Sequence, residues 1–210
     1  MEYNREKIVE RSWELFRKFG IKSVSMDDIA REMGISKKTL YQAVKDKNDI
    51  VAGVIDLVKE WGSNFWQVFY DDNFNAIEQH CRQREVVKGL HKQFNATFSF
   101  DLRKYYPELY REIIEWKKNV IMDVHVTNIE KGKKEGLYRS DVDAVVIAKL
   151  LVAHHLYTFD PTNEIFDASD IMDLSVIEQF YMYHLRGLAT AKGLKELDRL
   201  FANSKKAVNG

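Results

Sequence analysis

The segment SMDDIAREMGISKKTLYQAVKDK, residues 25–47, decides the fold of the first part of the chain. Its apolar positions recur three and four residues apart, which predicts two short helices over 26–33 and 37–44. Only the three residues 34–36, Gly-Ile-Ser, separate these helices. Two helices joined by a three-residue turn that contains glycine are typical of a helix-turn-helix.

The ends of both helices carry suitable capping residues. Ser25 precedes the first helix and Asp28 stands three positions later, which is the spacing of a capping box. Gly34 ends this helix, and Ser36 is a good N-cap for the next one. Local cap chemistry and helical periodicity therefore predict the same element boundaries.

The remainder of the chain also has a helical pattern. With 2 prolines and 10 glycines in 210 residues, few breakers punctuate it, which favours long helices over many short strands. We expect an all-α protein with an N-terminal three-helix head, residues 1–46, then a long connecting helix and a helical body, residues 47–210. The connecting helix is predicted from residue 46 or 47 through Phe69. The other helices are predicted over 4–19, 76–88, 91–102, 108–132, 141–157, 171–188 and 193–202. A break is expected between Gly132 and Gly136, and a loop over 158–169.

The composition excludes several classes of protein. The 32 Lys and Arg balance the 32 Asp and Glu, so binding of polyanions by bulk charge is excluded, whereas a local basic patch is not. The single cysteine, Cys81, excludes an internal disulfide and a cysteine-cluster metal site. We interpret Cys81 as a bystander, because a redox sensor needs an exposed thiolate of lowered pKa.

Several motifs are absent from the sequence. It has no run of about 18 apolar residues and its first residues lack the apolar core of a signal peptide, so we expect a soluble protein of the cytoplasm without membrane contact. It has no P-loop, no G-x-S-x-G, no H-E-x-x-H and no glycine-rich nucleotide loop. We therefore expect no enzymatic activity and no cofactor.

The positive charge is concentrated at the second helix of the helix-turn-helix. Residues 37–47 contain four lysines and one acid, a local charge of +3. Such a face is either merely solvated or contacts nucleic acid, and the adjoining helix-turn-helix favours nucleic acid. Its polar side chains suit phosphate oxygens or base edges; they are Lys37, Lys38, Thr39, Tyr41 and Gln42.

The stretch IAREMGISKKTLY, residues 29–41, followed by VKDK, residues 44–47, resembles the signature of the TetR family of bacterial transcriptional regulators. The resemblance covers about residues 8 to 55, and the rest of the chain matches in length and helical character. It implies a DNA-binding head and a body that binds a ligand and dimerises. One departure is Gln42-Ala43, where many members have an aromatic residue or histidine after the tyrosine.

The resemblance also implies roles for individual residues. Thr39, Tyr41 and Lys47 would contact phosphates, and Lys37, Lys38 and Gln42 would read bases. The predicted DNA-binding set comprises these six residues together with the N-cap serines, Ser25 and Ser36.

Aromatic residues in the body suggest an effector pocket, although most aromatic residues at helical spacing form ordinary core. The histidines invite a metal or proton-switch hypothesis, but no cysteine or carboxylate spacing supports a metal site. His154 and His155 are adjacent, so we expect them to face different sides of their helix. The predicted ligand-binding residues are Phe65, Trp66, Phe69, Phe94, Phe98, Trp116, His125 and His154.

A small head makes few DNA contacts, and a two-fold body is a simple way to hold two heads on two half-sites. Stripes on the last two long helices are candidates for the dimer interface, although they could also be internal core. They consist of Val145, Ala148, Leu151, Val152 and His155 on one helix and Phe180, Tyr181, His184 and Leu188 on the other.

The sequence therefore predicts a ligand-responsive regulator, a repressor that binds a palindromic operator in double-stranded DNA as a homodimer and is released by a small apolar or aromatic effector. The alternative is an all-helical dimeric binding or scaffold protein without a sensor role. Salt-sensitive binding of duplex DNA separates the two hypotheses.

Overall fold

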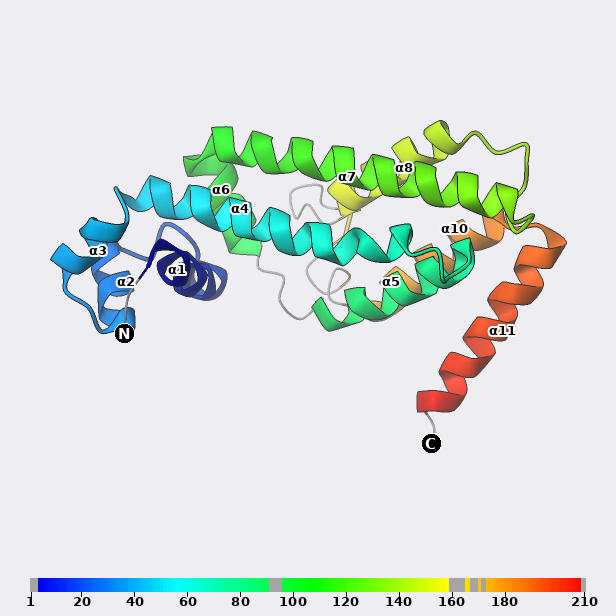
Figure 1. Ribbon diagram of the computed structural model, residues 1–210, viewed down its shortest axis with the longest axis horizontal. Helices are drawn as coiled ribbons and strands as arrows, with labels where there is room; N and C mark the ends of the chain where they lie inside the picture. Colours follow the sequence, from blue (N-terminus) through cyan, green and yellow to red (C-terminus); the bar gives the residue numbers. More distant parts are fainter. Residues whose placement is uncertain (1–3, 91–95, 159–164, 167–169, 171–172, 209–210) are drawn as a thin grey trace. The chain divides into compact units, whose positions relative to one another are not determined.

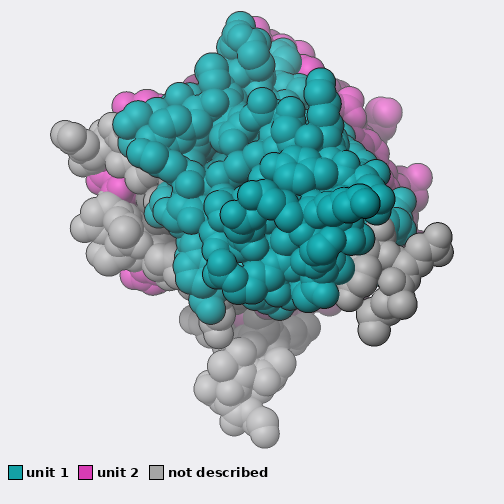
Figure 2. Space-filling model, turned by 90° about the vertical axis from the view of Figure 1, so that its left-hand side faces the viewer, with its two compact units in different colours: residues 1–64, 93–116 teal, residues 65–92, 117–210 magenta. Residues whose placement is uncertain are grey.

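The computed structural model describes residues 4–90, 96–158, 165–166, 170 and 173–208, with the backbone alone for 87–90, 96, 174 and 202–208. Across these residues the regular structure is helical, and the strand-like pairing consists of an isolated antiparallel bridge between Tyr138 and Ala189. The all-α prediction is confirmed. Two compact units divide the chain, residues 1–64 with 93–116 and residues 65–92 with 117–210 (Figure 2).

The first unit contains the predicted helix-turn-helix, and the second contains the helices of the body that follow (Figure 1). The boundary between the units falls within two helices, α4 and α7. The elements are α1 (Arg5–Phe19), α2 (Met26–Met33), α3 (Lys37–Ala43), α4 (Lys47–Trp66), the 3₁₀ turn η1 (Gln67–Tyr70), α5 (Ala76–Leu90), α6 (Ala96–Tyr105), α7 (Pro107–Lys134), α8 (Ala144–Thr158), α10 (Leu174–Leu188) and α11 (Ala191–Val208).

Two boundaries differ from the sequence prediction for identifiable reasons. The connecting helix ends at Trp66, and residues 67–70 tighten into a 3₁₀ turn. Gly132 does not break α7, which continues to Lys134. Instead, a Cβ at Gly132 would meet the buried Tyr138 ring at 2.1 Å, so this glycine makes room for a packed aromatic residue. Gly136, with φ of 70°, makes the turn that follows.

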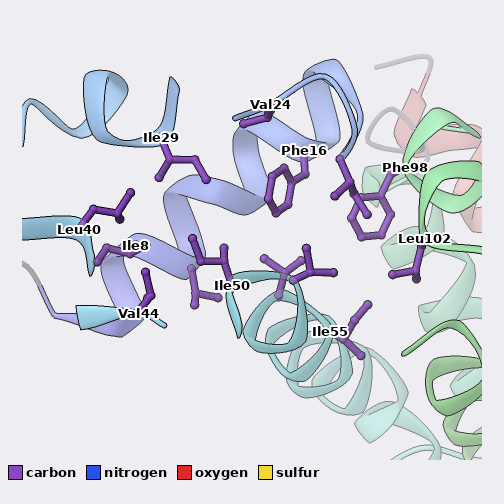
Figure 3. Packing of buried hydrophobic residues seen from close by; sticks show 14 of the residues in the cluster. Ile8, Phe16, Val24, Ile29, Leu40, Val44, Ile50, Ile55, Phe98 and Leu102 are labelled. Atoms are coloured by element: carbon purple, nitrogen blue, oxygen red, sulfur yellow. The ribbon is translucent and has the colours of Figure 1, made fainter. Parts of the chain in front are cut away.

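The core of the first unit joins the three head helices to α4, α6 and the start of α7. Figure 3 shows Phe16 of α1, Ile29 of α2 and Leu40 of α3 turned toward Ile50 of α4, with Phe98 of α6 beside them. Their burial is the main favourable contribution to folding of this unit, at about 25 cal/mol per Å² of apolar surface removed from water.

The second unit has its own apolar core, built around Ile77 of α5, Ile129 of α7 and Leu185 of α10. The bridge between Tyr138 and Ala189 ties the turn after α7 to the end of α10, through bonds of 2.9 Å from Arg139 N to Leu188 O and from Thr190 N to Leu137 O. No helix in the described part of the chain is long and apolar enough to cross a membrane.

Candidate nucleic-acid interface and buried imidazole cluster

The turn between α2 and α3 has the geometry that the sequence predicts. Gly34 adopts the left-handed conformation, with φ of 66°. Its backbone N–H donates to the carbonyl oxygens of Ala30 and Arg31 at the end of α2. The N–H of Ile35 donates to Ala30 O at 3.0 Å, which closes the corner between the helices. A residue with a Cβ would be strained at Gly34, because only glycine adopts this conformation at low cost.

Both N-cap serines are in place, and their hydroxyls have partners within the head. Ser25 and Asp28 form the predicted capping box, with Ser25 N donating to Asp28 Oδ2 at 2.9 Å and Asp28 N to Ser25 Oγ at 3.2 Å. Ser36 Oγ accepts from Thr39 N at 3.0 Å and lies 2.8 Å from Thr39 Oγ1. These bonds satisfy N–H groups that a helix N-terminus otherwise leaves free.

The helix α3 separates an apolar face from a polar one. Leu40 is buried, and so is Val44 directly after the helix, which fixes the orientation of α3 on the core. Thr39 is half-buried. The exposed face carries the remaining predicted contact residues of this helix, Lys37, Lys38, Tyr41 and Gln42.

An ion pair occupies one of the predicted base-reading side chains. Lys37 Nζ lies 2.7 Å from Asp27 Oδ1, across the turn from α2, and both side chains are more than half exposed. The hydrogen bond to Asp27 raises the pKa of Lys37. Nucleic acid would have to displace Asp27, so this carboxylate weakens the positive character of the surface.

Lys47 is more enclosed than a free phosphate-binding lysine. Its ammonium donates to Ile21 O at 2.6 Å, and burial lowers its pKa. The same loop is fixed from α6, where Asp101 accepts from Lys22 N at 2.8 Å. These contacts position the loop before α2 and therefore the helix-turn-helix itself.

The predicted ligand-binding residues separate into two groups. Phe65, Trp66, Phe69, His125 and His154 gather in the second unit. The prediction for the others is not met: Phe98 and Trp116 belong to the core of the first unit, and Phe94 lies outside the described residues.

Local packing explains why Phe98 and Trp116 lie in the core of the first unit. Phe98 lies edge-on to Trp13, with ring centroids 5.1 Å apart, and is 9% exposed. Trp116 lies over Gly62 of α4, where an added Cβ would meet its ring at 2.3 Å. Both aromatic residues thus fill ordinary core positions.

Five of the six histidines assemble inside the second unit, although they come from four helices. We call them the imidazole cluster. The rings of His80 and His125 stack with centroids 5.6 Å apart, and so do those of His125 and His155. Its members are His80 of α5, His125 of α7, His154 and His155 of α8, and His184 of α10.

Aromatic side chains surround this cluster. Trp66 lies 5.7 Å from the ring of His155, Phe69 lies 4.9 Å from that of His80, and Phe180 stacks on His154. His154 and His155 are successive residues that point to different sides of α8, and their rings lie 5.6 Å apart. Neighbouring residues on a helix diverge by about 100°, so both can border one broad cluster.

The cluster is held in the neutral form. Burial lowers the pKa of His154 to about 4, that of His155 to about 3 and that of His184 to about 4. Burial also lowers the pKa values of His80 and His125 well below their usual range. Neutral imidazoles each offer one N–H donor and one bare nitrogen acceptor.

The described residues contain no group of histidine, cysteine or acidic side chains arranged to hold a metal ion. Burial raises the pKa of Cys81 to about 11, which is the opposite of what a reactive thiolate needs. The interpretation of Cys81 as a bystander therefore agrees with its surroundings.

Sequence reasoning missed His80 and Gln83, which lie one turn apart on α5 and are both buried. The available signal was their spacing, since two polar side chains at i and i+3 share one helical face. Whether that face is buried depends on how α5 packs against α10, which the sequence of α5 alone does not specify.

The predicted dimer-interface residues need correction. Ala148, Leu151, Tyr181 and Leu188 are at most 7% exposed and form the interior of their own unit, so a partner cannot reach them. Val152, His155, Phe180 and His184 lie partly buried around the imidazole cluster. The helix α8 is apolar on several sides, so its periodicity did not distinguish the inner face from the outer one.

A different set of apolar residues on α8 and α10 is exposed to solvent. Val146, Leu150 and Tyr157 of α8 are 50%, 62% and 56% exposed, and Tyr183 of α10 is 81% exposed. We call these four residues the outer stripe. Its members on α8 are four and seven residues apart, so they share one side of the helix.

Comparison with known proteins agrees with the geometry of the head. Residues 8–54 match the family described as bacterial regulatory proteins, tetR family. A helix-turn-helix-type transcriptional regulator of Staphylococcus aureus strain USA300 is 44% identical over 52 residues, which is 25% of this chain and 28% of the relative. The similarity to the TetR family is thus shown for this N-terminal segment, and the chain spans about a quarter of the length of the relative. This family is one of regulatory proteins and not of enzymes.

Solved structures of other transcriptional regulators resemble the fold of most of the chain. A transcriptional regulator from Cytophaga hutchinsonii has a TM-score of 0.70 at 17% identity, and covers 88% of this chain and 98% of its own. The ketosteroid transcriptional regulator KstR2 of Mycobacterium tuberculosis has a TM-score of 0.55 at 17% identity, over 90% of this chain and 97% of that one. At these identities the likeness shows the fold alone.

Proposed function

We propose that this TetR-family protein is a transcriptional repressor of the cytoplasm that binds a palindromic operator as a homodimer and is released by a small aromatic or apolar effector. The observation that carries the proposal is the capped helix-turn-helix whose second helix exposes Lys37, Lys38, Tyr41 and Gln42. In this proposal residues 1–46, together with Lys47 at the start of α4, contact DNA, and the rest of residues 47–210 dimerise and bind the effector.

The DNA contacts divide by chemistry. Thr39, Tyr41 and Lys47 are assigned to phosphates, which carry no sequence code and set affinity for every duplex. Lys37, Lys38 and Gln42 are assigned to base edges in the major groove. Ser25 and Ser36 begin α2 and α3, whose N-termini favour a phosphate.

Two heads on one operator require a dimer, with half-sites about 34–36 Å apart or a multiple of this spacing. We assign the interface to the outer stripe, Val146, Leu150, Tyr157 and Tyr183, because three of these exposed apolar residues share one side of α8, and grouped exposed apolar residues mark interaction sites. This replaces the inner residues that the sequence suggested.

The effector is assigned to the imidazole cluster and its aromatic neighbours. The name of the mycobacterial structural relative, a ketosteroid regulator, supports a small-molecule role for this fold. The helix α4 begins at Lys47 and ends at Trp66, so one helix carries both a predicted DNA contact and an aromatic neighbour of the cluster. An effector that tilts α4 would misplace the heads, provided that it binds the DNA-released state more tightly.

The proposal is tested by sequencing the genomic DNA fragments that the purified protein retains at increasing salt. We expect enrichment of an inverted repeat and a salt dependence of affinity that reflects the released counterions. Retention of no fragments, or of random fragments only, would instead favour a dimeric binding or scaffold protein whose head contacts other proteins.

A further inference from the structure

Several buried polar atoms in and beside the imidazole cluster make no hydrogen bond of normal geometry within the part of the chain that the structure describes. They include both ring nitrogens of His80 and of His125, both amide atoms of Gln83, and Nε2 of His184. Each unpaired buried polar group costs about 1–3 kcal/mol, and native proteins leave few of them. Seven such atoms in one part of one unit are therefore suited to a polar ligand.

The helix α7 brings a cation to the same place. Lys117 stands four residues before Ile121 and eight before His125, so these three side chains share one face of α7. Ile121 packs against Trp66 and Phe69. Lys117 therefore lies on the face of α7 that carries the cluster.

The electrostatics of Lys117 agree with this placement. Burial is the main cause of the lowered pKa of His155, and the charge of Lys117 contributes in the same direction. Water reaches the side chain, yet the surrounding protein lowers the pKa of the ammonium through desolvation.

No carboxylate in the described part of the chain pairs with Lys117 or influences the five imidazoles. The groups that act on these rings are other histidines, Lys117 and the Asn128 amide near His80. The nearby Arg84 is already paired, at 2.8 Å from Glu85. Among the described residues, the cluster thus combines the Lys117 ammonium, which has no carboxylate partner there, with several N–H donors and aromatic neighbours.

We propose that the effector is a small aromatic carboxylic acid, bound as its anion with the carboxylate toward Lys117 and the imidazoles and its ring against Trp66 and Phe69. This inference rests on the proposed effector site and names its ligand class. The aromatic walls favour a planar ring, and the lone cation favours a negative charge, since charge-assisted hydrogen bonds are about twice as strong as neutral ones.

A bound anion would also favour the protonated form of a neighbouring imidazole, because an opposite charge nearby raises the pKa of histidine. We therefore expect the binding of an aromatic acid below pH 7 to be accompanied by proton uptake. A neutral ligand with the same ring would bind without this uptake.

The experiment uses the full chain without DNA and two matched pairs of probes, benzoate with benzamide and 2-naphthoate with 2-naphthamide. Titration calorimetry in buffers of different ionisation enthalpy measures affinity and proton uptake together, and intrinsic tryptophan fluorescence, to which Trp66 contributes, reports occupancy. At least one acid should bind about tenfold more tightly than its amide, a typical effect of one charge-assisted interaction.

Two variants locate the charge. Lys117→Met should remove the preference for the acid and leave amide binding unchanged, whereas Lys134→Met, an exposed lysine near the end of the same helix, should leave the preference intact. His125→Phe should reduce acid binding and proton uptake, with thermal unfolding as the check on folding. Amides that bind as well as acids, or a preference that survives in Lys117→Met, would overturn the proposal.

The outcomes also separate this inference from the proposed function. If an aromatic acid bound but left operator affinity unchanged, the proposed ligand class would stand and the proposed regulation by this ligand would be overturned. If neutral aromatic compounds alone released the operator, the proposed regulatory function would stand and the proposal of an aromatic acid as effector would be overturned. Tight binding of Zn²⁺ or Ni²⁺ with no binding of either acid would overturn it in favour of a metal site.

Discussion

The ammonium group of Lys47, at the first residue of α4, donates a 2.6 Å hydrogen bond to the main-chain oxygen of Ile21, in the loop before α2. The same oxygen accepts a longer bond, 3.4 Å, from Val24 N. Lys47 therefore stabilises the loop that supports the helix-turn-helix, in addition to the phosphate contact proposed for it. A substitution at this position should act on stability and on DNA binding together.

The first prediction separates these two effects. Lys47→Ala should weaken binding to all duplexes alike, because a phosphate carries no sequence code, and should lower the free energy of unfolding by about 1 kcal/mol. Lys38→Ala, at an exposed position, should leave stability unchanged and relax the preference for one base per half-site by about 1–3 kcal/mol. Urea unfolding and binding-site selection measure both effects, and an unchanged site preference in Lys38→Ala would remove its base-reading role.

The second prediction concerns the ion pair between Lys37 and Asp27. Asp27→Asn should strengthen binding to every duplex several-fold at low salt, because it frees Lys37 and removes a negative charge from the DNA-facing surface. The gain should shrink as salt rises, since the pair is exposed. Asp173→Asn, a change of the same charge at the start of α10, is the matched control and should leave DNA affinity unchanged.

The third prediction concerns pH. Folding lowers the histidine pKa values from 6.5 to about 4, 3 and 4 at His154, His155 and His184, so the unfolded chain binds more protons below pH 6.5. Stability should therefore fall as pH decreases from about 6.5 toward 4. At pH 5 each such histidine should cost about 2 kcal/mol relative to pH 7.5.

The check is urea unfolding at pH 7.5, 6 and 5 in parallel with His155→Phe. The free energy of unfolding of the variant should fall less steeply as the pH decreases. Its slope against pH should be smaller by the contribution of about one bound proton. Equal pH slopes for the two proteins would contradict the neutral, buried state of His155.

The fourth prediction compares two glycines. A Cβ at Gly193 would lie 2.1 Å from Leu137 O, a backbone atom that cannot easily move, so Gly193→Ala should lower the free energy of unfolding by about 1–3 kcal/mol. Gly187 in α10 has nothing within 4 Å, and Gly187→Ala should raise it by about 0.5–1 kcal/mol through helix propensity. Thermal unfolding that shifts in the same direction for both variants would be inconsistent with this packing.

The fifth prediction concerns the outer stripe. Leu150→Glu combined with Tyr183→Glu should convert the dimer into a folded monomer, because desolvating two unpaired carboxylates is costly. Phe19→Glu, at an apolar residue that is 50% exposed in the first unit, should remain dimeric. Sedimentation velocity distinguishes the two states, and a double variant that stays dimeric would place the interface elsewhere.

The sequence by itself determined the head and the helical class of the body. Capping residues, the glycine turn and the position of Leu40 act over a few residues, so their outcome can be read directly along the chain. Pro107 begins α7, one residue before the predicted start, because it lacks the N–H that a first helical turn leaves unused.

Only the tertiary structure decided which faces of the body helices are inside. Leu151 and Leu150 are neighbours of the same chemical type, yet one is 3% exposed and the other 62%. The imidazole cluster likewise joins residues more than a hundred positions apart, from His80 to His184. Long-range packing sets these relationships, because a helix with apolar residues on several sides can bury more than one of its faces.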